Sequence, residues 1–130
     1  MAHRAAPEIR VVIAAGEAMR RVFRDGVSRA GLEIAAECGD SSELLTTVAS
    51  EHPDVVVVDR ALRGGSLAAL AAITTQRRRP KVLVVGGRGS DAEIQAARLA
   101  GATDCLPVDV GSEGLAAAIA GLVQTEKETS

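Results

Sequence analysis

Short apolar runs recur along the chain, and each is followed by a segment with the spacing of a helix. Because the first, third and fourth runs are apolar without alternation, they are typical of parallel strands covered by helices on both faces. The second run alternates and therefore predicts a strand at the edge of the sheet. In order, the runs are IRVVIAA (9–15), LEIAAEC (32–38), DVVVVD (54–59), KVLVVG (81–86) and the weaker TDCLP (103–107).

The segments between the runs carry helix signals. In the first of them, at 19–30, apolar residues recur every three or four positions. Asp40 and Ser90 are each followed three residues later by a glutamate, which is the spacing of a capping box. A third helix is expected over about residues 66–76, and Ser112 is expected to cap the last one.

Five alternating strand and helix units joined by short loops predict a single doubly wound α/β domain. This is a (βα)5 flavodoxin-like fold with a parallel five-stranded sheet and right-handed crossovers. The domain is expected to span residues 8–123, between an N-terminal tail at 1–7 and a polar C-terminal tail or linker start at 124–130. In this architecture ligands and chemistry lie at the carboxyl ends of the strands, where Asp59 ends the third run.

Composition and charge exclude several classes of function. Aromatic residues make up only 1% of the chain, so stacking on nucleic-acid bases is not expected. The net charge of −2 gives no field that would attract DNA or an anionic membrane. No apolar stretch approaches the ~18 residues of a membrane span. We therefore expect a cytoplasmic protein without direct nucleic-acid or membrane contact.

Few residues have the pattern of metal ligands or catalytic groups. Cys38 and Cys105 lack the CxxC spacing of a metal site and fit a reducing compartment. Neither His3 nor His52 has a partner in the sequence, and no nucleophile has a histidine close by in a known motif. The basic run at 77–79 is interpreted as a solvated helix end. The sequence therefore predicts no metal, no cofactor and no enzymatic activity.

Three segments of the chain resemble the receiver domain of bacterial response regulators. They are PDVVVVD (53–59) with Gly64 five residues later, KVLVV (81–85) and AARLAGATDCL (96–106). The resemblance covers about residues 8–123 and implies a sheet of strand order 2-1-3-4-5. It also places Asp59 at the position of the aspartate that takes a phosphoryl group from a histidine kinase.

The resemblance fails at the residues that support phosphorylation. Family members hold a magnesium ion with an acidic pair after strand one, and bind the phosphoryl group with a Thr or Ser after strand four and a Lys after strand five. They also carry a switch aromatic in strand five. The matching residues here are Ala15 and Gly16, Gly86, Val108 and Cys105. Glu17 is the one acid close enough to the missing pair to reach a cation. We therefore expect an atypical receiver in which Asp59 is hydrogen-bonded to loop amides but is not phosphorylated.

The loop after the fourth strand supports a different class of function. Gly87, Gly89 and Ala92 have GxGxxA spacing after a strand and before a helix, so backbone amides from Gly87 to Ser90 could cradle a phosphate. A receiver-derived sensor of a nucleotide or another small ligand is therefore an alternative function. A conventional phosphoacceptor at Asp59 is a second alternative. Without a ligand, the loop is expected to fill the space left by the missing threonine.

The outward faces of the fourth and fifth helices predict a partner surface. Leu99 points outward beside Ala92 and Ala96, and the fifth helix turns Ala117 and Ala120 outward. Similar receivers dimerise through helix four, strand five and helix five, so we expect a homodimer or a protein partner at this face. The predicted function is signal transduction in transcription control through phosphorylation-independent protein contacts. A DNA-binding output domain outside this chain is a possible partner.

Overall fold

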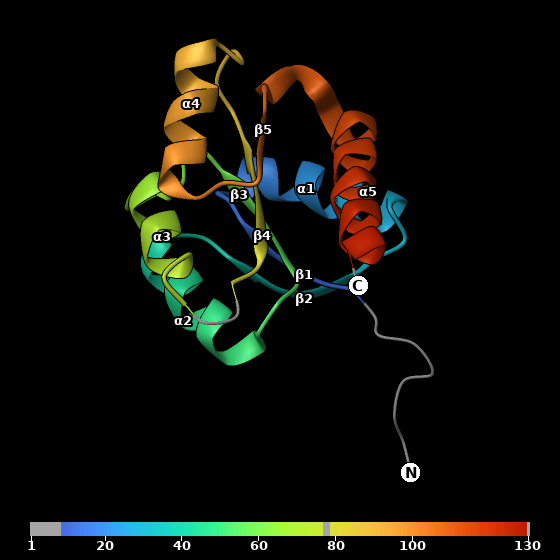
Figure 1. Ribbon diagram of the computed structural model, residues 1–130, viewed down its shortest axis with the longest axis horizontal. Helices are drawn as coiled ribbons and strands as arrows, with labels where there is room; N and C mark the ends of the chain where they lie inside the picture. The colour runs from blue at the N-terminus through green and yellow to red at the C-terminus, as the bar shows by residue number, and fades with distance from the viewer. Residues whose placement is uncertain (1–8, 77–78, 130) are drawn as a thin grey trace.

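A parallel five-stranded sheet forms the centre of the computed structural model, which describes residues 9–76 and 79–129 (Figure 1). The strands lie in the order β2-β1-β3-β4-β5, which confirms the predicted doubly wound topology. They are β1 (Arg10–Ala14), β2 (Glu33–Cys38), β3 (Val55–Asp59), β4 (Lys81–Val85) and β5 (Asp104–Leu106). The predicted tail at 1–7, which includes His3, and residues 77 and 78 of the basic run lie outside the described residues.

Helices cover both faces of the sheet. α1 and α5 pack on one face, and α2, α3 and α4 pack on the other (Figure 1). The helices are α1 (Glu17–Arg29), α2 (Ser41–Glu51), α3 (Ser66–Ile73), α4 (Asp91–Ala100), the short 3-10 helix η1 (Val108–Val110) and α5 (Gly111–Thr129). Within the described ranges, none of these helices has the length and apolar character needed to cross a membrane.

Burial on two sides explains why the central strands are apolar without alternation. In β3 the valines at 55 and 57 pack in one cluster with Phe23 of α1, and those at 56 and 58 pack in the other with Leu70 of α3. All four valines are fully buried. Burying one such side chain contributes about 1.5–3 kcal/mol. β3 is therefore firmly anchored and holds Asp59 at a fixed place on the edge of the sheet.

The predicted helix caps at Asp40 and Ser90 are present. Oδ1 of Asp40 accepts a hydrogen bond from the amide of Glu43 at 2.8 Å, although the Glu43 carboxylate accepts from Gly39 rather than from the cap residue. The Ser90 hydroxyl accepts from the amide of Glu93, and the Glu93 carboxylate accepts from the amide of Ser90, which completes a reciprocal capping box.

Three helix ends differ from the sequence expectation. α3 ends at Ile73, three residues earlier than expected. α5 begins one residue before Ser112, so the Ser112 hydroxyl does not cap the helix and instead donates to the Val22 carbonyl of α1 at 3.4 Å. α5 then continues to Thr129, into the segment 124–130 that was expected to form a tail. Packing against α1 thus replaces the local capping signal at the start of α5.

The two cysteines lie on opposite edges of the sheet. Cys38 ends β2 and Cys105 lies in β5, and both are buried free thiols. Burial raises the pKa of the Cys38 thiol to about 11 and also raises the pKa of Cys105. Both thiols therefore stay protonated at neutral pH and act as small apolar side chains.

Candidate functional site

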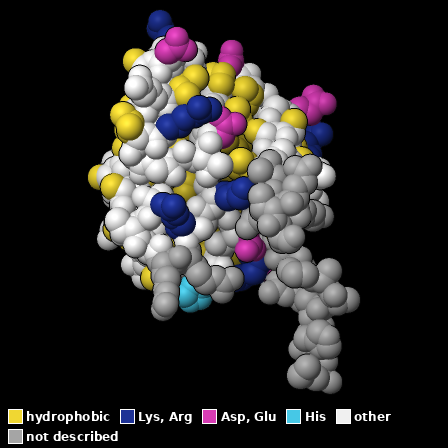
Figure 2. Space-filling model, in the orientation of Figure 1, with side chains coloured by type: hydrophobic (Ala, Val, Ile, Leu, Met, Phe, Trp, Pro, Cys, Tyr) yellow, Lys and Arg dark blue, Asp and Glu magenta, His cyan; other side chains and the backbone are white. Residues whose placement is uncertain are grey.

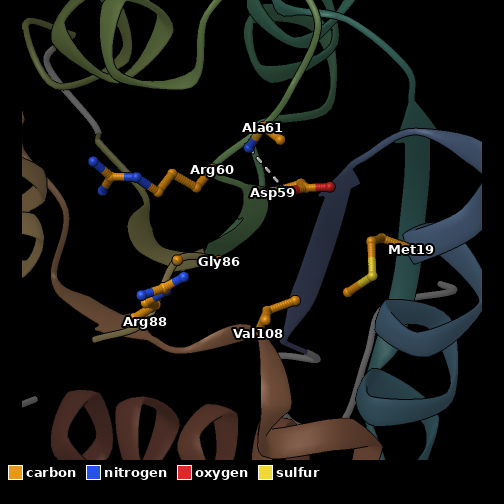
Figure 3. A pocket seen from close by; sticks show the side chains of 8 residues that line it. Met19, Asp59, Arg60, Ala61, Gly86, Arg88 and Val108 are labelled. Carbon is orange, nitrogen blue, oxygen red and sulfur yellow. Dashed lines mark hydrogen bonds between the residues drawn. The ribbon is translucent and has the colours of Figure 1, made fainter. Parts of the chain in front are cut away.

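Loops from four strands surround Asp59 at the carboxyl edge of the sheet. One pocket there has a volume of about 560 Å³ (Figure 3). Its lining residues are Met19, Asp59, Arg60, Ala61, Gly86, Gly87, Arg88 and Val108. A second hollow of about 400 Å³ adjoins it, and its lining includes Gly16, Glu17, Arg20 and again Asp59. The predicted phosphoacceptor position thus lies where a ligand or a reacting group would approach.

The Asp59 carboxylate is held by its own loop. Its Oδ1 accepts a hydrogen bond from the backbone amide of Ala61 at 2.9 Å (Figure 3). The Asp59 carbonyl accepts a second bond from the amide of Leu62, also at 2.9 Å. The first contact forms an Asx-turn, in which a carboxylate orders the two residues after it. Asp59 therefore makes the kind of loop-amide contact expected from the sequence.

The residues around Asp59 do not fit the magnesium ion that the family resemblance implies. Magnesium needs several oxygen ligands in near-octahedral geometry, and Ala15 and Gly16 at the end of β1 offer no side-chain oxygen. Glu17 is an exposed residue in the first turn of α1 and lines the second hollow. In the described part of the chain, no three or more His, Cys, Asp or Glu residues form a group that could hold a metal ion.

Arg20 of α1 occupies the end of β1. Its guanidinium donates to the Ala15 carbonyl through Nε at 3.3 Å and Nη2 at 3.0 Å. Its Nε also lies 4.0 Å from the Glu37 carboxylate of β2. Arg20 thus places a permanent positive charge in the hollow that adjoins Asp59, and this charge repels a metal ion. No sequence pattern marks Arg20 as a residue of this site, because its reach back to β1 depends on how α1 packs.

Arg60 fills the space beside Gly86. A Cβ on Gly86 would lie 2.7 Å from the Cβ of Arg60, and the φ of Gly86 is +147°. The Arg60 amide donates to the Val85 carbonyl at 2.8 Å, which fixes this side chain against the end of β4. The Arg60 side chain runs away from Asp59 (Figure 3), and its Nη1 is buried without a hydrogen-bond partner among the described residues. A side chain at residue 86 would therefore collide with Arg60, and the loop residues Gly87 and Arg88 line the pocket beside Asp59.

The loop between β4 and α4 is tied to the first turn of α4. Oε1 of Glu93 accepts hydrogen bonds from the amides of Arg88 at 2.9 Å and Ser90 at 3.1 Å. The bonds from Ser90 and Arg88 lower the pKa of the Glu93 carboxyl. Gly87 and Gly89, the other predicted ligand residues, have φ values of +77° and +75°. Two of the amides predicted to cradle a phosphate therefore already bind a carboxylate of the same chain.

The end of β5 contributes no charge to the pocket. Val108 opens η1, lines the pocket, and is 52% exposed. Its amide donates to the Gly87 carbonyl at 3.2 Å, which joins the end of β5 to the loop after β4. The position that the resemblance matched to the family lysine therefore does lie beside Asp59, but it carries an aliphatic side chain.

The predicted partner surface lies on α4 and α5, with β5 between them (Figure 1). Leu99 is 81% exposed and is the more exposed of two large hydrophobic residues on the surface of the described chain. The other residues of this surface are Ala92, Ala117 and Ala120, which are exposed, and Ala96, which is partly buried. Figure 2 shows hydrophobic side chains among basic and acidic ones on the α4 side of the molecule.

Residues 11–120 match the response regulator receiver domain family. The chain therefore belongs to this family, and it is a receiver domain of the kind that acts in two-component signalling. Receiver domains are signalling domains and are generally not enzymes.

One curated relative and many solved structures share this domain. The chain is 34% identical over 113 residues to protein-glutamate methylesterase/protein-glutamine glutaminase 5 of Myxococcus xanthus, and the match covers 82% of this chain but 32% of that protein. The signal receiver domain of the putative response regulator NarL from Mycobacterium tuberculosis is 23% identical to this chain and superimposes with a TM-score of 0.77. The match covers 92% of this chain and 98% of the NarL chain. A CheY-like receiver from Methanospirillum hungatei is 17% identical with a TM-score of 0.82, with coverages of 95% and 100%. At these identities the two structures show a shared fold.

We expect Gly86→Ala to destabilise the domain. The new Cβ would meet the Arg60 side chain at 2.7 Å, and residues with a side chain rarely adopt a φ of +147°. Overpacking and backbone strain of this kind cost about 1–3 kcal/mol, which is measurable as a loss of unfolding free energy in urea. Gly16→Ala is the matched control, because nothing lies within 4 Å of its Cβ position and its φ is −66°. Equal stability of the two variants would contradict the packing assigned to Arg60.

Proposed function

We propose that this receiver domain signals without phosphorylation of Asp59, through protein contacts and self-association. One observation carries the proposal. The positions that would bind the metal and the phosphoryl oxygens hold Gly16, Gly86 and Val108, and none of these has a charged or hydrogen-bonding side chain.

Phosphoryl transfer needs positive charge that neutralises the phosphoryl oxygens in the transition state and in the phosphorylated product. A phosphorylated aspartate would carry close to two negative charges, where the carboxylate carries one, beside Met19 and Val108, which are apolar. Arg20 is a cation in the hollow on the β1 side, but its guanidinium already donates to the Ala15 carbonyl. A guanidinium also has no lone pair to offer a metal ion, so Arg20 cannot replace the missing acidic pair. These contacts favour an Asp59 that stays unmodified.

A conventional phosphoacceptor at Asp59 is the competing function. The access to Asp59 from two hollows favours it, and Arg88 lines one of them. We favour the phosphorylation-independent function because an accessible Asp59 still lacks the acidic pair that would bind the metal and the lysine that would bind the phosphoryl group. The small-ligand sensor has less support than either, because Arg88 and Ser90 already donate their amides to Glu93.

For the partner surface we propose a second copy of this chain as the occupant. Leu99 is a large apolar side chain with 81% exposure, and the neighbouring Ala92 and Ala96 allow a second helix to come close. Ala117 and Ala120 extend the surface of small side chains onto α5. A two-fold axis near Leu99 would pair each such surface with itself, which is the commonest arrangement of soluble dimers.

The output of this signalling would lie in a separate domain. The chain spans about a third of the length of its Myxococcus xanthus relative, so that relative has further segments. The matching structures also include a DNA-binding response regulator of the LuxR family from Staphylococcus aureus. We propose that self-association of this domain in the cytoplasm controls a DNA-binding domain and thereby transcription.

Incubation with acetyl phosphate and Mg²⁺ is expected to leave the intact mass of the protein unchanged. The reason is that the site lacks the acid pair for the metal and the lysine for the phosphoryl group. Asp59→Asn is the control for modification elsewhere on the chain. A stoichiometric gain of one phosphoryl group in the wild type, lost in Asp59→Asn, would establish the conventional function instead.

Leu99→Arg is expected to weaken self-association while leaving the fold intact, since it places a charge at the centre of the proposed contact. Loss of a central apolar contact raises a dissociation constant by about tenfold or more, which sedimentation equilibrium can measure. Ala49→Arg, at an exposed position on α2, is the matched control and should behave as the wild type. A wild type that is monomeric at high concentration, or a variant that associates equally well, would rule out this face.

A further inference from the structure

The carboxylate of Glu93 lies at the centre of the loop between β4 and α4. Its Oε1 accepts from the amides of Ser90, the cap of α4, and of Arg88 two residues upstream. A capping box requires only the first of these bonds. The additional bond to Arg88 extends the contact from the helix end into the loop itself.

The backbone of the loop is shaped around this carboxylate. A Cβ on Gly87 would lie 2.5 Å from Oε2 of Glu93, so only a glycine allows the carboxylate to lie against the loop here. Gly87 also has a φ of +77°, which glycine adopts without strain. The Glu93 carboxylate and Gly87 therefore form one closely packed unit.

The charged form of Glu93 is favoured first by the two loop amides and, to a smaller extent, by the charge of the partly buried Arg60. Arg60, whose Nη1 is buried without a hydrogen-bond partner among the described residues, interacts electrostatically with Glu93. Arg60 is in turn fixed by its amide bond to the Val85 carbonyl at the end of β4. Two loop amides and the guanidinium of Arg60, which directly follows β3, thus act on a single carboxylate.

The same loop is joined to β5 by backbone bonds. The amide of Gly86 donates to the Leu106 carbonyl at 2.8 Å, and the amide of Val108 donates to the Gly87 carbonyl at 3.2 Å. Glu93 itself belongs to α4, which carries Leu99 six residues further on. The position of the carboxylate therefore sets how the start of α4 lies relative to the end of β5.

We propose that Glu93 is an internal anion that locks the loop at 86–90 and the first turn of α4 in one arrangement. The negative charge of this lock belongs to the Glu93 side chain, so the lock acts whatever the charge on Asp59. It holds α4 against β5 without an added anion at the strand ends. This inference stands apart from the question of whether Asp59 is phosphorylated or whether the chain dimerises.

Hydrogen exchange measured by mass spectrometry on the full chain tests the lock. In Glu93→Ala we expect the amides at 87–90 to exchange about tenfold faster, since a hydrogen bond to a charged group is lost at each of two amides. The amides of β4 should keep wild-type protection and serve as the internal reference. Glu93→Gln keeps the shape and an acceptor oxygen but loses the charge, and it should give an intermediate rate.

Two controls separate the lock from other effects. Asp91→Ala removes an exposed carboxylate from the same helical turn and should leave exchange at 87–90 unchanged. Asp59→Asn should also leave it unchanged. If Asp91→Ala accelerates exchange as much as Glu93→Ala, then the loss of any negative charge near the positive end of the helix dipole causes the acceleration. That result overturns the proposal. Acceleration in Asp59→Asn, or wild-type exchange in both Glu93 variants, overturns it as well.

Discussion

Burial of β3 between two helical layers is the constraint on which the rest of the structure depends. The four valines at 55–58 alternate between the two hydrophobic clusters, so β3 cannot shift by one residue without turning its side chains to the wrong layer. This register fixes Asp59 at the strand end and Arg60 one residue further on. Arg60 then lies against the end of β4, where a side chain on residue 86 would collide with it. The register of β3 is therefore one physical reason for a glycine at position 86.

Two arginines lie at the ends of the strands that flank Asp59. Arg20 binds the carbonyl at the end of β1, and Arg60 occupies the volume beside Gly86 at the end of β4. Both carry a permanent charge, and Arg20 lies 4.0 Å from the Glu37 carboxylate. The Glu93 carboxylate provides the opposite charge within the chain. The charged side chains at this edge thus contact groups of the same chain, which is consistent with a domain that works through its surface.

The sequence predicted the fold well because the signals that determine it are local. Unbroken valine runs, capping residues and short loops predicted the strands and the helices. The family resemblance supplied the sheet order and placed Asp59, Gly86 and Val108 around one pocket. Arg20, Arg60 and Glu93 escaped notice as parts of the site because each acts through a long side chain whose direction depends on tertiary packing. The predicted start of α5 was wrong for a related reason, since the Ser112 hydroxyl donates to the Val22 carbonyl of α1 instead of capping its own helix.

Binding of a phosphoryl analogue would test most directly whether the strand-end site can still support phosphorylation. Beryllofluoride with Mg²⁺ forms an adduct with an aspartate only where metal ligands and phosphoryl contacts are both in place, and fluorine NMR detects the bound form. With Asp59 flanked by Gly16, Gly86 and Val108, we predict no bound fluorine signal and no change in the amide spectrum at millimolar Mg²⁺. A saturable, Mg²⁺-dependent signal that disappears in Asp59→Asn would contradict the account.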